Sequence, residues 1–272
     1  MPRNGHPSIR RAIPSLARLP RRVFSRAESL PSGSWAPEHR HDWVQLSYAL
    51  SGVLAVRTAG GSFIAPPQRA IWIPAGVEHR VTTSSRAEMR SLYIERGACA
   101  RQDEACEVLE VTPLARELIK AASTLGPDYD EDGAAGRLVS VLLDEIAALH
   151  GVAFNLPMPG DARLQRLCAA LQAAPDDGRT LGQWGREVGL TERSIARLFV
   201  KETGLSFGDW RLRLRMLLSL GPLETGASVT RVALDMGYAS TSAFIAAFRR
   251  VFGTTPREMF ARGERVEGER AS

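Results

Sequence analysis

The sequence predicts two domains of different class, an N-terminal all-β domain with trailing helices and a C-terminal all-helical domain. Three observations lead to this prediction: 272 residues suffice for two cores, the apolar period changes near Thr112, and one helix-turn-helix pattern occurs twice. Apolar and charged contents of 44% and 24% are typical of a globular protein. We find neither a membrane-spanning apolar run nor a secretory signal, so we expect a cytoplasmic protein without membrane contact.

Basic residues are unevenly distributed along the chain. Residues 1–30 carry a net charge of +6, residues 31–160 carry −5 and residues 161–272 carry +4. A basic C-terminal third behind an acidic middle indicates that this part meets a polyanion. Residues 1–23 are interrupted by prolines and lack an apolar period, so we expect a disordered basic tail; extra contacts with the polyanion are the alternative.

Residues 24–110 consist of short apolar or alternating runs, among them VQLSYAL, VLAVRT, SFIAPP and AIWIP, separated by SG and AG turns. This spacing predicts an antiparallel sandwich or barrel. Residues 111–150 then predict two amphipathic helices, the first beginning at Thr112-Pro113. They either cover their own sheet or pair with a second copy. GVAFNLPMPGD predicts a linker over 151–160, with the boundary near residue 158.

The duplicated pattern begins at Gly189 in GLTERSIARLF and at Gly237 in GYASTSAFIAAF. Each glycine can end one helix in the left-handed conformation before a polar residue starts the next. The second helix of such a unit can lie in a DNA major groove. Two copies joined by the basic helix FGDWRLRLRMLLSL therefore predict a domain over 161–265 that grips two successive grooves. Gly221-Pro222 predicts that this connecting helix ends or bends near Leu220.

Residues 180–260 resemble the DNA-binding domain of the AraC/XylS family of bacterial transcription regulators. The resemblance is carried by TLGQWGREVGLTERSIARLFVKETGLSFGDW and SVTRVALDMGYASTSAFIAAFRRVFGTTP, with GLTERSIARLF, KETG, ALDMGY and FGTTP as the specific parts. It implies binding of double-stranded promoter DNA, activation or repression, and RNA polymerase as a partner if the protein is an activator.

The outward faces of the two second helices differ in chemistry. Arg193 and Arg197 are the best candidates for base contacts, because arginine can bond bidentately to guanine; phosphate contacts are the alternative. The other copy offers little beyond contacts with thymine methyls and groove shape, with its arginines on phosphates. The expected DNA-binding set is Arg193, Ser194, Arg197, Lys201, Thr241, Ser242, Ile245, Arg249 and Arg250.

HRHDWVQLSYALSG holds His39, His41 and Gln45, and PAGVEH holds His79. Strand alternation puts the first three on one face of the sheet. Imidazoles are ligands for Zn, Ni, Co, Cu or Fe, so one hypothesis is a divalent metal site; residues that line an organic effector pocket are the other. Trp43, Tyr48 and Trp72 lie among the predicted strands and either line such a pocket or belong to the core.

The spacing H-x-H-x3-Q-x6-G followed by P-x-G-x2-H resembles the two cupin motifs, in which three histidines and a carboxylate hold a metal inside a small barrel. Gln45 stands where the glutamate is usual. Together the two resemblances imply a regulator controlled by a small ligand or metal in a cupin-like barrel. Homodimerisation through 111–150 is one of the two roles expected of that helical pair. The alternative is a metal-dependent cupin enzyme fused to a DNA-binding domain; Gln45 and the absence of grouped acid or base residues argue against it.

Overall fold

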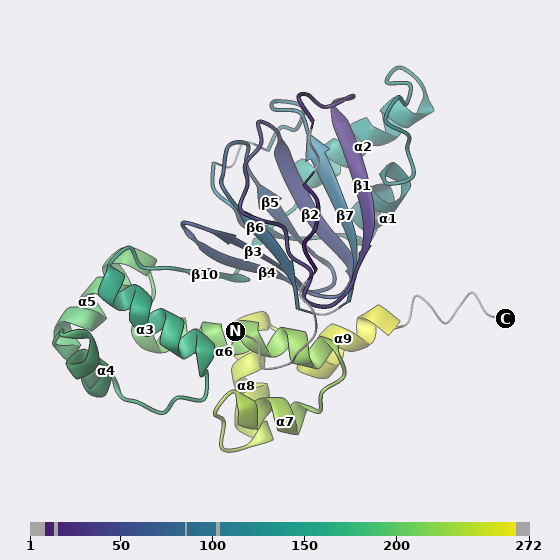
Figure 1. The fold of residues 1–272 in the computed structure, drawn as a ribbon. Helices are drawn as coiled ribbons and strands as arrows, with labels where there is room; N and C mark the ends of the chain where they lie inside the picture. Colours follow the sequence, from purple (N-terminus) through teal and green to yellow (C-terminus); the bar gives the residue numbers. More distant parts are fainter. Residues whose placement is uncertain (1–8, 14–15, 85, 102–103, 265–272) are drawn as a thin grey trace. The chain divides into compact units, whose positions relative to one another are not determined.

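The computed structural model describes residues 9–13, 16–84, 86–101 and 104–264 (Figure 1). The chain divides into an N-terminal unit, mainly residues up to 59 and 63–155, and a C-terminal unit, mainly residues 60–62 and the chain from Leu156 onward. The first contains antiparallel sheets and two helices, and the second is helical. The predicted fold class is confirmed.

The N-terminal unit contains two sheets. Strands of the larger follow the order β1 (Val23–Leu30), β7 (Ala87–Ile94), β2 (Val44–Ser51), β5 (Arg69–Ile73), β8 (Glu107–Glu110) and β9 (Gly151–Val152). Strands of the smaller follow the order β10 (Asn155–Pro157), β4 (Gly61–Ala65), β3 (Leu54–Thr58) and β6 (Arg80–Thr83). Because β2 lies inside the larger sheet, its residue Gln45 is paired with Ile73 and Tyr93 and is only 1% exposed.

Helices α1 (Pro113–Ala122) and α2 (Ala134–Ala148) pack against the larger sheet (Figure 1). The Thr112 hydroxyl accepts from the Ala115 backbone and starts α1, as its position before Pro113 predicts. Ile119, Leu142 and Ile146 are fully buried in the core that also contains strand residues. Of the two expected roles, covering their own sheet is therefore the one that these contacts establish.

Part of the expected disordered tail is ordered. Residues 1–8 and 14–15 of the range 1–23 lie outside the described residues, but the Trp35 backbone donates to the Ile9 carbonyl at 2.9 Å and accepts from Arg11 at 2.7 Å. The Arg11 side chain is only 7% exposed and forms an ion pair with Glu28. The prediction of disorder is therefore wrong for the described residues, because a charged side chain from the tail is paired in the unit.

The division between the two units falls between Asn155 and Leu156, inside the predicted linker 151–160, but part of this stretch is regular structure. β9 pairs Val152 with Val108, and β10 joins the smaller sheet. Phe154 and Leu156 are 4% and 3% exposed, so burial of these apolar side chains holds a stretch in which glycine and proline indicated a break.

The C-terminal unit contains α3 (Ala162–Ala173), α4 (Leu181–Val188), α5 (Glu192–Thr203), α6 (Phe207–Glu224), α7 (Val229–Asp235), α8 (Thr241–Phe252) and α9 (Pro256–Glu264). Gly189 is left-handed at φ 71°, and the Thr191 hydroxyl caps α5. Ser228 and Ser240 cap α7 and α8 in the same way. Both predicted helix pairs are thus formed, α4 with α5 and α7 with α8.

The connecting helix α6 does not end at Leu220, so that part of the prediction is wrong, while a bend there stays a prediction. The helix continues to Glu224 with Pro222 in its last turn. At this position proline removes the donor to the Leu218 carbonyl close to the helix end, where few further helical hydrogen bonds depend on it. Burial of Leu220 and Leu223, 0% and 8% exposed, supports the turn that follows it.

Candidate functional site

Three histidines meet in the N-terminal unit. His39 and His79 form an antiparallel bridge, with backbone hydrogen bonds of 3.0 and 2.9 Å in the two directions. Their ring centroids lie 4.3 Å apart, and the His41 ring lies 5.2 Å from that of His79. One ligand atom from each ring falls within 4.8 Å of the others. The two sequence motifs therefore come together as their spacing predicted.

Each of these rings has its Nδ1 atom against a backbone carbonyl. For His39, His41 and His79 the partners are the carbonyl oxygens of Pro37, Trp43 and Val77, at 2.8, 2.8 and 2.9 Å. A carbonyl only accepts, so Nδ1 carries the proton and Nε2 keeps its lone pair in each neutral ring. Metal-binding histidines are held in the same way by their second nitrogen.

Burial favours the neutral form of two of these rings, His79 and His39. It lowers the pKa of His79 to about 4, with the charges of the neighbouring histidines acting in the same direction. Burial also lowers the pKa of His39. The Nε2 atom of His79 is buried and has no hydrogen-bond partner within the described parts of the chain. A neutral, partnerless nitrogen is the form that a metal ion requires.

The Gln45 side chain contacts the histidine cluster through His41. Its Oε1 atom lies 3.0 Å from Nε2 of His41, and its Nε2 atom donates to the Ser47 hydroxyl at 2.8 Å. Three arrangements satisfy the contact with His41. The ring carries a proton on both nitrogens, the amide is turned by 180° so that it donates to a neutral ring, or both lone pairs face one cation.

A cavity of about 420 Å³ borders the histidines. Its lining consists of Ile13, Leu16, Ala17, His39, Arg40, His41, Asp42, Trp43 and Tyr93. The Trp43 ring stacks on His41 with centroids 5.2 Å apart and an angle of 8° between the planes. The volume is that of a small-molecule site. Of the three expected pocket residues, Trp43 borders this cavity, whereas Tyr48 and Trp72 are 1% exposed and belong to the core beneath α1 and α2.

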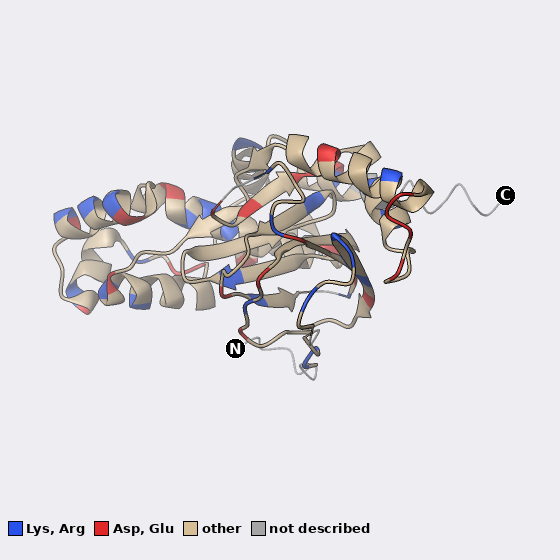
Figure 2. Cartoon of the chain, turned by 90° about the horizontal axis from the view of Figure 1, so that it is seen from above, with Lys and Arg blue, Asp and Glu red and all other residues tan. Residues whose placement is uncertain are grey.

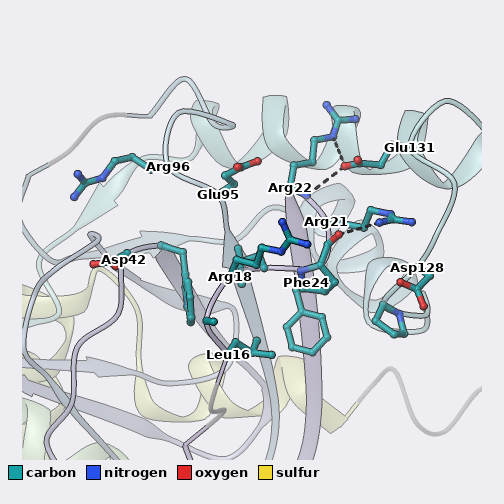
Figure 3. A pocket seen from close by; sticks show the side chains of 15 residues that line it. Leu16, Arg18, Arg21, Arg22, Phe24, Asp42, Glu95, Arg96, Asp128 and Glu131 are labelled. Carbon is teal, nitrogen blue, oxygen red and sulfur yellow. Dashed lines mark hydrogen bonds and ion pairs between the residues drawn. The ribbon is translucent and has the colours of Figure 1, made fainter.

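A second cavity of about 1130 Å³ shares Leu16, Ala17, Asp42 and Trp43 with the first (Figure 3). Its rim carries four arginines and four acidic residues, Arg18, Arg21, Arg22, Arg96, Asp42, Glu95, Asp128 and Glu131. Two of these guanidinium groups are occupied: Arg21 donates to the Tyr129 carbonyl at 2.9 Å, and Arg22 donates to the Gly136 carbonyl at 2.9 Å and to the Ser140 hydroxyl at 2.7 Å. This balanced lining selects no single charge of ligand.

The first predicted reading helix is α5. Arg193, Arg197 and Lys201 recur every fourth residue on its exposed face. Ser194 is half-buried, and its hydroxyl lies 2.8 Å from that of the cap residue Thr191. Ser194 thus helps to start the helix, while the three cations are free to meet an anion.

The second predicted reading helix is α8. Ser242, Arg249 and Arg250 are exposed, and Ile245 is half-buried. The Thr241 hydroxyl donates to that of Thr230 at 3.1 Å. Arg250 is 72% exposed and lies 3.3 Å from Asp209. Figure 2 shows basic residues along the helices of the C-terminal unit, interspersed with acidic ones.

Sequence reasoning missed the roles of two groups of arginines. Arg11 and Glu28 form a shielded pair in the N-terminal unit, and the single acidic residue among the first thirty was the available signal. Arg211 and Arg215 of the connecting helix were expected only to make it basic. Both donate instead to backbone carbonyls of the segment between α3 and α4.

Comparisons with known proteins agree with this architecture. Residues 30–148 match the AraC-like ligand binding domain, and residues 184–262 match a helix-turn-helix domain. The HTH-type transcriptional regulator NimR of Escherichia coli is 36% identical over 84% of this chain and 83% of its own. RipA of Corynebacterium glutamicum is 33% identical over 37% and 30%. The crystal structure of ToxT from Vibrio cholerae O395 is 11% identical over 89% and 98%, with a TM-score of 0.39. In the described part of the chain, no helix has both the length and the apolar character needed to cross a bilayer.

Proposed function

The chain belongs to the AraC family of transcription regulators, and on that premise we propose that a divalent transition metal bound in its N-terminal unit controls promoter binding. It is a sequence-specific DNA-binding regulator with an N-terminal ligand-binding domain, and double-stranded promoter DNA is its partner. It is not the metal-dependent enzyme that the cupin motifs alone left open, since its relatives are regulators.

The proposed ligands are His39, His41 and His79, with the Gln45 amide oxygen beside them. The observation that supports this is the shared orientation: all three Nδ1 atoms are held by backbone carbonyls, and the Nε2 atom of His79 is buried without a partner in the described residues. Imidazole nitrogen and a neutral oxygen suit Zn, Ni, Co or Fe better than Mg or Ca. A bound ion would cross-link residues 39–45 to residue 79 and so stiffen this part of the unit.

Such an ion regulates only if it binds one DNA-binding state more tightly than the other. The measured effect on promoter affinity would equal that difference, typically 1–3 kcal/mol for coupled sites. In this proposal the protein works in the cytoplasm, where promoter DNA is, and an organic effector in the 420 Å³ cavity remains the second candidate signal. Contact with RNA polymerase follows if the protein activates.

The test combines metal content with DNA binding. We would strip the full chain with EDTA, reload it with Zn, Ni, Co or Fe(II) and measure bound metal per chain. Fluorescence anisotropy would then follow binding to DNA from the gene's own upstream region. His39→Gln and His79→Ala should lose the metal and the response. His150→Ala is the matched control, because His150 is exposed and lies outside the cluster. Specific DNA binding by a chain that retains no metal would reduce the histidines to the wall of an organic pocket.

We also propose homodimerisation through the outer faces of α1 and α2. Leu114 and Val141 on these helices are 54% and 48% exposed and give this face apolar side chains that a second copy could cover. Val141→Glu should convert a dimer to a monomer in sedimentation velocity without lowering the melting temperature. Unchanged mass with unchanged stability would exclude this face.

A further inference from the structure

The segment between α3 and α4 touches both the connecting helix α6 and the second helix-turn-helix. Arg211 on α6 donates to the Arg179 carbonyl at 3.2 Å and to the Asp177 carbonyl. One turn further along α6, Arg215 donates from Nε to the Pro175 carbonyl at 2.7 Å. Charged donors on backbone carbonyls make directional and comparatively strong hydrogen bonds. Residues 175–179, here called the bracing loop, are therefore fixed along α6.

The bracing loop is also tied to the first helix-turn-helix. The Arg179 guanidinium lies 3.6 Å above the ring of Trp184 on α4, and it pairs with Asp177 and Glu187. Trp184 is 1% exposed and belongs to the core of this motif. A change in the position of the bracing loop would therefore disturb contacts made by α4.

At its other side the bracing loop meets the turn of the second helix-turn-helix. A Cβ atom on Gly237 would lie 2.9 Å from Nη2 of Arg215 and 2.9 Å from Cα of Asp176. Tyr238, the next residue, has its ring 5.7 Å from the Arg215 guanidinium carbon. The close approach needs a residue without a side chain, in addition to the positive φ of 75° at this turn.

We infer that Arg215, with Arg211, is a positioning residue that sets the relative orientation of the two helix-turn-helix motifs. Each motif reads one DNA half-site, so this orientation determines the one spacing between half-sites that the protein accepts. Helix α6 packs against elements of both motifs, and Figure 1 shows it between them. If α6 were the only connection, rotation of one motif relative to the other about the axis of α6 would be opposed only by side chains that pack on this helix. The bracing loop adds a second connection beside that axis. Two reading helices held in this way fit two major grooves only at one separation.

The inference depends on DNA binding and not on the metal, so it can fail while the metal proposal stands. We would first select a two-half-site operator for the wild-type protein from a random DNA library. Anisotropy titrations would then use operators with one or two base pairs inserted or removed between the half-sites. The wild-type protein should lose affinity roughly tenfold or more on a shifted operator, the size of a typical mismatch penalty. Arg215→Met should reduce that difference to less than about threefold while the base preference within each half-site stays the same.

Arg215→Lys separates geometry from charge. Lysine keeps the positive charge, but it has a single donor group in place of the guanidinium that reaches both the Pro175 carbonyl and the Tyr238 ring. It should lose spacing preference as the methionine variant does. If lysine restored wild-type spacing preference, attraction to DNA would explain the effect and the positioning role would be wrong.

A pair of glycine variants tests the same contact from the opposite side. Gly237→Ala introduces the Cβ that meets the bracing loop. Gly189→Ala is the matched control: it occupies the equivalent turn of the first motif with φ of 71°, and nothing lies within 4 Å of its Cβ position. Both should lower the melting temperature through backbone strain, but only Gly237→Ala should change spacing preference. Equal changes in spacing for the two, or wild-type spacing in a folded Arg215→Met, would overturn the inference.

Discussion

Nε2 of His41 and Oε1 of Gln45 lie 3.0 Å apart although neither carries a proton in the tautomer that the Trp43 carbonyl selects. Two lone pairs at this distance repel each other unless the amide is turned or a positive charge lies near both. Protonation of the ring, a turned amide and a bound cation each remove this repulsion, so substitutions at Gln45 test the proposed metal site.

Gln45→Glu should strengthen metal binding. A carboxylate in place of the buried amide supplies a negative charge, which the neutral imidazoles do not offer to a divalent cation. We expect affinity to rise at least tenfold, about 1.4 kcal/mol or more. Competition with a fluorescent chelator measures it. Without metal the same variant should melt at a lower temperature, because a buried carboxylate is then unpaired. An affinity equal to that of the wild-type protein would show that this side chain does not face the ion.

Arg11→Met should destabilise the N-terminal unit. Arg11 and Glu28 are 7% and 14% exposed, and Arg26 also pairs with Glu28 at 2.8 Å, so removing Arg11 leaves the shielded carboxylate with one of its two cations. We expect a loss of about 1.5–3 kcal/mol in the free energy of unfolding, measured by urea denaturation. The double variant with Glu28→Gln should recover part of the loss, and equal stability of the two variants would argue against the pairing.

Arg197→Ala should relax base preference. Its side chain projects from the exposed face of α5, where bidentate contact with guanine is possible. A cost of about 1–3 kcal/mol confined to one base pair is expected from binding to a panel of single-base operator variants. A uniform loss over all variants would assign Arg197 to a phosphate instead.

Arg250→Ala should weaken binding to all sequences alike. Its guanidinium is mainly exposed, with Asp209 as a neighbour at 3.3 Å. Loss of one phosphate contact should reduce the slope of log affinity against log salt by about 1. Asp209→Ala is a useful companion, because freeing the arginine from its acidic neighbour should strengthen binding modestly. A change in base preference for Arg250→Ala would contradict the phosphate role.

The sequence was sufficient for the elements whose cause is local. Gly189, Thr191 and the capping serines act within a few residues. The strand alternation expected of His39 and His41 is not what places them, because both precede β2 and His39 pairs with His79 in an isolated bridge. What it did not reveal depends on contacts between distant residues. Whether Arg215 faces DNA or the Pro175 carbonyl depends on where a loop forty positions earlier folds back. Pro222 was similarly expected to end or bend the helix. The free-energy cost of this proline depends on how close it lies to the helix end and on the burial of Leu223.

The close approach of Gly237 to the bracing loop has a consequence for protein engineering. The second motif cannot be exchanged between regulators as a self-contained segment, because its turn is shaped against Asp176 and Arg215. A chimera that receives only residues 228–253 from this chain would keep its base preference but would accept the wrong spacing between the two DNA half-sites. One that also carries residues 175–179 and the full length of α6 would keep its operator geometry. The part of the chain that must be transferred to keep DNA specificity is thus longer than the predicted reading helix alone.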